Sequence, residues 1–170
     1  YQAGCLSGFN CLSLIYLVMK HTESLHDYYT FTNKEVPKDL LCRGKVMSHF
    51  NVLKRSNCSV TLPFVRRDYY KICLLDDEAL LQTANQKIRI DRPSIFFSNP
   101  EIDYGWQTVS EKQKGYICLF NDGYLSNELK SALRKLNSLF KVGSYPFLFL
   151  QREEFDLFCL YFERLQEEYN

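Results

Sequence analysis

The feature that most constrains the fold is a series of short apolar runs, separated by turn-forming residues, between residues 46 and 121. The runs are roughly 5 to 8 residues long with a turn about every 8 to 12, a pattern typical of a sandwich or barrel and not of a parallel sheet with crossover helices. They are rich in β-branched and aromatic residues, which favour pleated, half-buried surfaces. The expected strands are 46–54, 69–75, 79–83, 87–90, 95–98 and 116–120. Residues 147–150 fit either another strand or a buried connection.

The composition is that of an ordinary globular chain with many aromatic residues. Of the 170 residues, 46% are apolar and 24% are charged, which excludes a disordered or collagen-like chain. The 13 Phe, 12 Tyr and one Trp favour a sheet-rich core, because aromatic side chains bury large areas. The net charge of +1 predicts no direct binding to nucleic acid or to an anionic membrane. We expect one domain, with at most a short helical appendage.

Two helices are predicted in the C-terminal zone, residues 122–170. Ser126 can cap the first, which is basic, and the second runs from about residue 152 to 169 and is acidic, so their charges favour pairing. The second helix places apolar residues at alternating spacings of three and four, as in a coiled-coil seam. The residues expected at a homodimer interface are Leu133, Leu136, Phe155, Phe158, Phe162 and Leu165. The alternative is that both helices pack on the β-domain of their own chain.

The first eighteen residues differ from the rest because they contain no charged side chain. A secretory signal would need a basic region ahead of its apolar one, and a membrane span would need about 20 uninterrupted apolar residues. We expect residues 1–18 to be upstream or non-native sequence, with Met19 as the initiator and no membrane attachment. The alternative is a signal anchor, which would make the protein a membrane-tethered binding module.

The cysteines and histidines supply no motif for a metal site or a catalytic centre. Seven cysteines are scattered without a CxxC pair, which argues against a zinc ribbon and favours a reducing, cytoplasmic compartment. His21, His26 and His49 are wrongly spaced for the metal ligands of a β-barrel enzyme, and His49 is expected to be a hydrogen-bonded core or rim residue. No Gly-rich phosphate loop is present. We expect no metal, no cofactor and no enzymatic activity.

A binding site is better supported by the sequence. Two arginines stand beside aromatic residues where a strand begins, and a Tyr-Gly-Trp segment follows a turn. Arginine with Tyr and Trp at strand ends is typical of a pocket for a small polar or anionic ligand. The candidate ligand-binding residues are Arg66, Arg67, Tyr70, Tyr104, Trp106 and Tyr116. Two alternatives stay open: the arginines form a surface pair with Asp68, and Trp106 is a core residue.

Residues 92–104 carry a family resemblance. Their sequence, RPSIFFSNPEIDY, resembles a segment of the sensor domains of AraC-type transcriptional regulators, in particular Bacteroidetes-like members. The order of other features agrees: a His-Phe-Asn strand, then RRDYYKI, then the segment itself, then GYICLFN and two terminal helices. The resemblance covers about residues 22–170.

The resemblance implies a cupin-like β-barrel of the jelly-roll type over residues 46–121, preceded by an N-terminal arm over 19–45. The barrel would bind a small effector, and the helices of 122–170 would dimerise. DNA would be bound only through helix-turn-helix units that are absent from this chain. Asp103-Tyr104 replaces the His pair of sugar-binding members, and Asp76 stands at their sugar-binding arginine. Arabinose is therefore not the expected effector, and the identity of the effector stays open, with a sugar and a small anion as the candidate classes. The alternative function is a standalone cupin-like enzyme such as a sugar isomerase.

Overall fold

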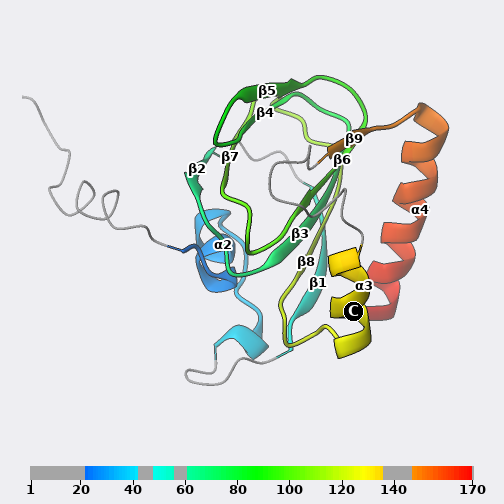
Figure 1. Cartoon of the computed structure of the whole chain (residues 1–170). Coiled ribbons are helices and arrows are strands. Elements are labelled where there is room, and N and C mark those ends of the chain that lie inside the picture. Colours follow the sequence, from blue (N-terminus) through cyan, green and yellow to red (C-terminus); the bar gives the residue numbers. More distant parts are fainter. Residues whose placement is uncertain (1–21, 42–47, 56–60, 136–146, 170) are drawn as a thin grey trace, which may run out of the picture.

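The chain folds into two antiparallel β-sheets that face each other, with one long helix against the outer face of the larger sheet (Figure 1). The computed structural model describes residues 22–41, 48–55, 61–135 and 147–169. The helical elements are α2 (Leu25–Phe31), the 3-10 turn η1 (Lys38–Leu40), α3 (Asn127–Lys135) and α4 (Arg152–Tyr169). The strands are β1 (Phe50–Lys54), β2 (Thr61–Val65), β3 (Tyr70–Leu75), β4 (Ala79–Gln82), β5 (Lys87–Ile90), β6 (Ser94–Ser98), β7 (Tyr104–Thr108), β8 (Gly115–Phe120) and β9 (Phe147–Phe149).

The strand order is that of a jelly roll. The larger sheet runs β1-β8-β3-β6-β9 and the smaller sheet runs β2-β7-β4-β5. Each early strand pairs with the late strand that mirrors it about the β4–β5 hairpin: β1 with β8, β2 with β7, and β3 with β6. The chain is therefore equivalent to one long antiparallel hairpin rolled up so that successive pairs alternate between two sheets, which defines the double-sheet jelly roll.

The expectation of a mainly β fold followed by two helices is confirmed, but the expected closed barrel is not what forms. Within the described residues, the sheets remain separate, with β1 and β9 at the edges of one and β2 and β5 at the edges of the other. Alternation of apolar residues shows that a sheet face is buried, whereas closure depends on hydrogen bonds between distant strands. Of the two readings left open for residues 147–150, the strand is the one that forms: β9 joins the larger sheet beside β6.

Two strands, β2 and β7, were not among the predicted ones. β2 contains Pro63, which cannot donate to a ladder and is tolerated because β2 is an edge strand. β7 contains Gly105, and a Cβ there would lie only 3.3 Å from the backbone nitrogen of Phe64 on β2. Each strand therefore contains a residue of poor strand propensity that only its tertiary surroundings make acceptable, and for this reason strand propensities did not predict either one.

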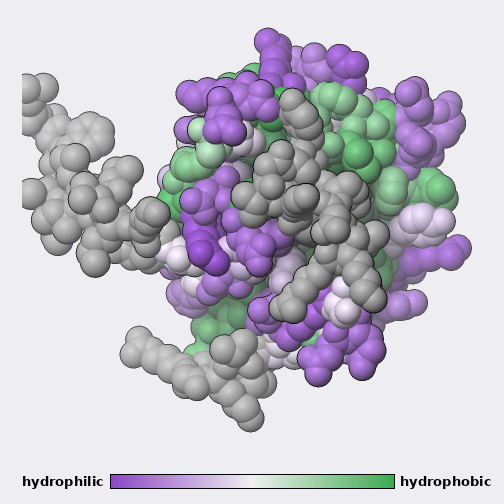
Figure 2. Space-filling view, viewed as in Figure 1, coloured by the Kyte–Doolittle hydropathy of each residue, from purple (hydrophilic) through white to green (hydrophobic). Residues whose placement is uncertain are grey.

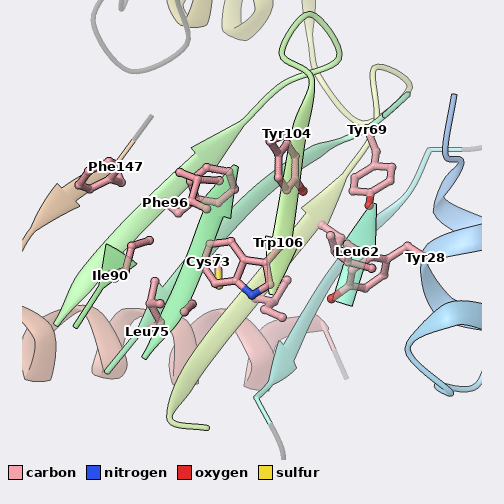
Figure 3. Close-up of a cluster of buried hydrophobic side chains, with 14 of the residues drawn as sticks. Tyr28, Leu62, Tyr69, Cys73, Leu75, Ile90, Phe96, Tyr104, Trp106 and Phe147 are labelled. Carbon is pink, nitrogen blue, oxygen red and sulfur yellow. The ribbon is translucent and has the colours of Figure 1, made fainter. Parts of the chain in front are cut away.

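The inner layer between the sheets is built from alternating positions. On β3, Cys73 and Leu75 point inward, and Phe96 and Phe147 continue the row on β6 and β9. From the smaller sheet, Leu62, Leu81, Ile90, Tyr104 and Trp106 meet them, as Figure 3 shows for most of these side chains. Tyr28 of α2 reaches the same cluster from one end. Because the side-chain period of a strand is two, Lys71 and Ser98 share this inward face with Cys73 and Phe96.

The outer face of the larger sheet is covered by α4. Phe155 and Phe162 are each 5% exposed and pack against a second cluster that includes Val52 and Cys118. Phe158 and Leu165 are partly buried against the same cluster. Four of the expected dimer-interface residues therefore contact the sheet of their own chain, which is the alternative that the sequence left open. The Leu133 side chain and Leu136 lie outside what the structure describes.

Polar contacts fix α4 to the strands at both of its ends. Arg152 donates to Asp76 at 2.7 Å in the turn after β3, and Gln166 donates to the Val52 carbonyl at 3.1 Å. Asp76, which the resemblance placed at a sugar-binding position, is thus used to hold α4 and does not face the inner layer. No helix among the described residues is long and apolar enough to cross a membrane.

The N-terminal segment is attached to the jelly roll where β2 passes into β3. Glu23 forms a parallel bridge with Arg67, and its backbone exchanges hydrogen bonds with Arg66 and Asp68 at 2.9 and 3.1 Å. Ser24 then caps α2 through a capping box with Asp27. Residues 22–41, the described part of the expected arm, are therefore packed onto the end of the inner layer. Residues 1–18 lie outside the described ranges.

Candidate functional site

The six predicted ligand-binding residues fall on different surfaces of the fold. Arg67, Tyr104 and Trp106 lie between the two sheets and are almost fully buried. Arg66 is exposed on the outside of the chain. Tyr70 and Tyr116 belong to the outer face of the larger sheet, beneath the helices. Successive side chains of a strand point to opposite faces of the sheet. Residues that are close in sequence therefore lie on different surfaces, and the six residues do not form one site.

Tyr70 and Tyr116 have structural roles on the outer face. The Tyr70 ring stacks on Phe120, with centroids 5.0 Å apart, and its hydroxyl donates to Asp122 at 3.0 Å. The Tyr116 hydroxyl donates to Glu163 of α4 at 2.7 Å. Burial, followed by the hydrogen bond and the charge of Glu163, raises the pKa of Tyr116 to about 12. Both tyrosines are separated from the inner layer by the sheet itself.

Arg67 is fully buried, and protein groups occupy its donors. Nε donates to Glu23 Oε1 at 3.1 Å, and Nη1 donates to the carbonyls of Tyr104 at 2.6 Å and Val65 at 3.1 Å. Nη2 donates to the carbonyl of Pro63 at 3.3 Å. The predicted ligand-binding arginine is therefore a structural one, which joins the N-terminal segment, β2 and β7.

Tyr69 completes this buried ion pair. Its hydroxyl donates to Glu23 Oε1 at 2.5 Å. Burial, together with the nearby Tyr104 and Glu23, raises the pKa of Tyr69 well above its ordinary value. The second carboxylate oxygen, Glu23 Oε2, is buried without a hydrogen-bond partner among the described residues. Neither Glu23 nor Tyr69 was predicted as a site residue, because nothing in the sequence shows that the N-terminal segment returns to β3.

Lys71 is the residue of the inner layer that sequence reasoning missed most clearly. It is 3% exposed, although it is a lysine in a strand. Its Nζ lies 5.3 Å from the ring centre of Tyr28, 5.6 Å from that of Trp106 and 6.0 Å from that of Tyr104. These distances are those of cation–π contacts. The ammonium has no hydrogen bond or ion pair with any residue in the described ranges.

Two buried hydroxyls near Lys71 also have no partner. Ser98 lies directly opposite Lys71 in the β3–β6 ladder, and its Oγ is buried without a hydrogen bond to the described part of the chain. The hydroxyl of Tyr104, whose ring faces both Arg67 and Lys71, is likewise unpaired there. Buried polar groups in proteins are nearly always hydrogen-bonded, so such a group needs an explanation. Lys71, Ser98 and Tyr104 thus bring three polar groups into the layer between the sheets.

A second buried cation, Arg55, has an ion-pair partner, although its Nε has no hydrogen-bond partner among the described residues. Arg55 Nη2 donates to both carboxylate oxygens of Asp77, at 2.8 and 2.9 Å, and Nη1 donates to the sulfur of Cys73 at 3.1 Å. Burial raises the pKa of Asp77, and the charge of Arg55 opposes that shift. This ion pair lies at the other end of β3 from Lys71, so it does not neutralise the ammonium.

His49 is a hydrogen-bonded core residue, as predicted. Its Nδ1 lies 2.6 Å from Asp39 in η1, and its Nε2 lies 3.2 Å from the hydroxyl of Tyr29. Asn51 donates to the same hydroxyl at 2.9 Å, and burial raises the pKa of Tyr29 to about 12. This network ties the N-terminal segment to β1. No group of three or more possible metal ligands occurs in the described ranges.

Comparisons with known proteins return few matches. No family model matches the chain, and no curated protein matches it significantly. Among solved structures, the chain is similar to ToxT from Vibrio cholerae, with 12% identity and a TM-score of 0.43 over 68% of this chain and 47% of that one. It is also similar to Vibrio cholerae ToxT bound to (E)-4-(8-methylnaphthalen-1-yl)but-3-enoic acid, with 12% identity and a TM-score of 0.45 over 71% of this chain and 49% of that one. The chain therefore spans about half the length of these solved structures.

Proposed function

We propose that this chain is the effector-binding domain of an AraC-type transcriptional regulator, with a cupin-like jelly roll that holds a small molecule between its two sheets. The ordered series of motifs over about residues 22–170 supports the family assignment, and the jelly-roll strand order agrees with it. The observation that carries the proposal is the pair of buried hydroxyls of Ser98 and Tyr104, which have no hydrogen-bond partner among the described residues and lie beside the Lys71 ammonium in an aromatic layer. A ligand that satisfies them would remove the cost of leaving them unpaired.

The site is placed so that a ligand can influence the N-terminal segment. Tyr28 of α2 faces the Lys71 ammonium, and Glu23 of the same segment is paired with Arg67 behind Tyr104. A ligand that prefers one position of this segment would shift its population, and that shift is how an effector acts on DNA-binding units elsewhere in the protein. We propose a cytoplasmic protein without enzymatic activity, which reaches DNA only through such units.

Homodimerisation remains part of the proposal, with a different surface from the predicted seam. Leu157, Leu160 and Tyr161 are each about half exposed and share the outward face of α4 at spacings of three and four. Figure 2 shows apolar residues among hydrophilic ones on the side of the molecule where α4 lies. Contiguous exposed apolar residues mark interaction surfaces. Sedimentation of the Leu160→Glu variant tests this surface, and a dimer mass that survives the change excludes it.

Small-molecule binding is tested with the single tryptophan of the chain. Trp106 lies in the inner layer, so its fluorescence should report a ligand between the sheets. We expect at least one compound in a library of sugars and organic acids to shift Trp106 emission and raise the unfolding temperature together. Tyr104→Leu should abolish both effects, whereas Arg66→Ala, on the exposed side, should leave them intact. Compounds that bind equally to the Tyr104→Leu variant would place the site elsewhere.

The regulator assignment is tested separately from binding. Sequencing the source DNA past the codon for Asn170 should show a reading frame that continues into two helix-turn-helix units. A stop codon there would instead favour the alternative of a standalone cupin-like protein.

A further inference from the structure

We draw no further inference here: the strongest candidate, the apolar surface at the edge strand β9 of the larger sheet, where Leu148 and Phe149 are each 48% exposed, carries nothing because nothing in the described part of the chain shows what covers it.

Discussion

The guanidinium of Arg67 lies 3.8 Å from the ring centre of Tyr104, and its Nη1 donates to the backbone carbonyl of that same tyrosine. One side chain thus holds both the ring and the backbone of β7 against the turn between β2 and β3. Glu23 completes the arrangement from the N-terminal segment. The arginine therefore fixes the position of the ring that faces Lys71.

Breaking this buried ion pair should strongly destabilise the protein. Glu23→Ala leaves the Arg67 charge without its carboxylate and the Tyr69 hydroxyl without its acceptor. We expect a loss of about 3 to 5 kcal/mol in the free energy of unfolding, measured by urea denaturation. The control is Arg66→Ala, at the exposed neighbouring position, which should change it by less than about 0.5 kcal/mol. A loss below about 1 kcal/mol for Glu23→Ala would contradict the buried pair.

The seam of α4 should contribute to folding and not to association. Phe162 is 5% exposed against the larger sheet, so Phe162→Ala should cost about 3 to 5 kcal/mol in the free energy of unfolding. Leu160→Ala, at a position 56% exposed on the same helix, should cost far less. Sedimentation of the folded Phe162→Ala protein should give the same mass as the unaltered chain. A change of mass without a loss of stability would contradict this prediction and place Phe162 at a subunit interface.

Gly115 should tolerate no side chain. Its φ of 112° is unfavourable for other residues, and a Cβ there would lie 2.1 Å from the carbonyl oxygen of Leu74 on the paired strand. Gly115→Ala should therefore cost about 3 kcal/mol in the free energy of unfolding, from strain and displaced backbone. Gly105→Ala is the matched control, because its Cβ meets neighbours only at 3.3 Å or more. Equal losses in the two variants would contradict this reading of Gly115.

Stability should fall in alkaline solution between pH 10 and 12, in part because of Tyr116. Burial and the hydrogen bond to Glu163 raise its pKa to about 12, above the model-peptide value of 10.0. In that window the folded state keeps the phenolic proton and the unfolded state loses it, so stability decreases as the pH rises. Below pH 10 the contribution is fully present.

The contribution of Tyr116 is isolated by comparing variants. Urea unfolding of Tyr116→Phe should show a shallower decline of stability between pH 10 and 12 than the unaltered chain. Glu163→Gln should lie between the two, since it removes the carboxylate but not the burial. Identical slopes in all three proteins would show that Tyr116 ionises as easily in the folded state as in the unfolded one.

Much of the fold could be predicted because local patterns reflect local burial. The hairpin of β4 and β5 and the central strands β3, β6 and β8 lie close to the runs expected for them, since each is a short apolar run between turns. The strands β2 and β7 were not predicted. Pro63 is acceptable in β2 because that strand lies at the edge of its sheet, and Gly105 suits β7 because the backbone of β2 approaches it closely. Those conditions concern neighbours that are distant in sequence.

The site was predicted in part. Tyr104 and Trp106 were singled out as aromatic residues after a turn, and they do lie in the inner layer. Lys71 was missed because a charged residue in a strand is ordinarily assigned to the solvent side, where its charge costs nothing. Lys71 lies two and four residues before Cys73 and Leu75, so it shares their inward face. That face could be identified only once the structure showed that both sides of β3 are covered.

By itself, the sequence determined the class of the protein: a mainly β chain with two C-terminal helices, rich in aromatic residues and close to neutral overall. These properties follow from composition and from local propensities and periodicities, which depend on residues only a few positions apart in the chain. Tertiary structure alone decided which sheet face each side chain joins, that the α4 seam packs on its own chain, and that Lys71 has no carboxylate partner among the residues the structure describes. The reason is physical. Burial and charge pairing are set by contacts between residues far apart in the chain, such as Glu23 with Arg67, and no local pattern encodes them.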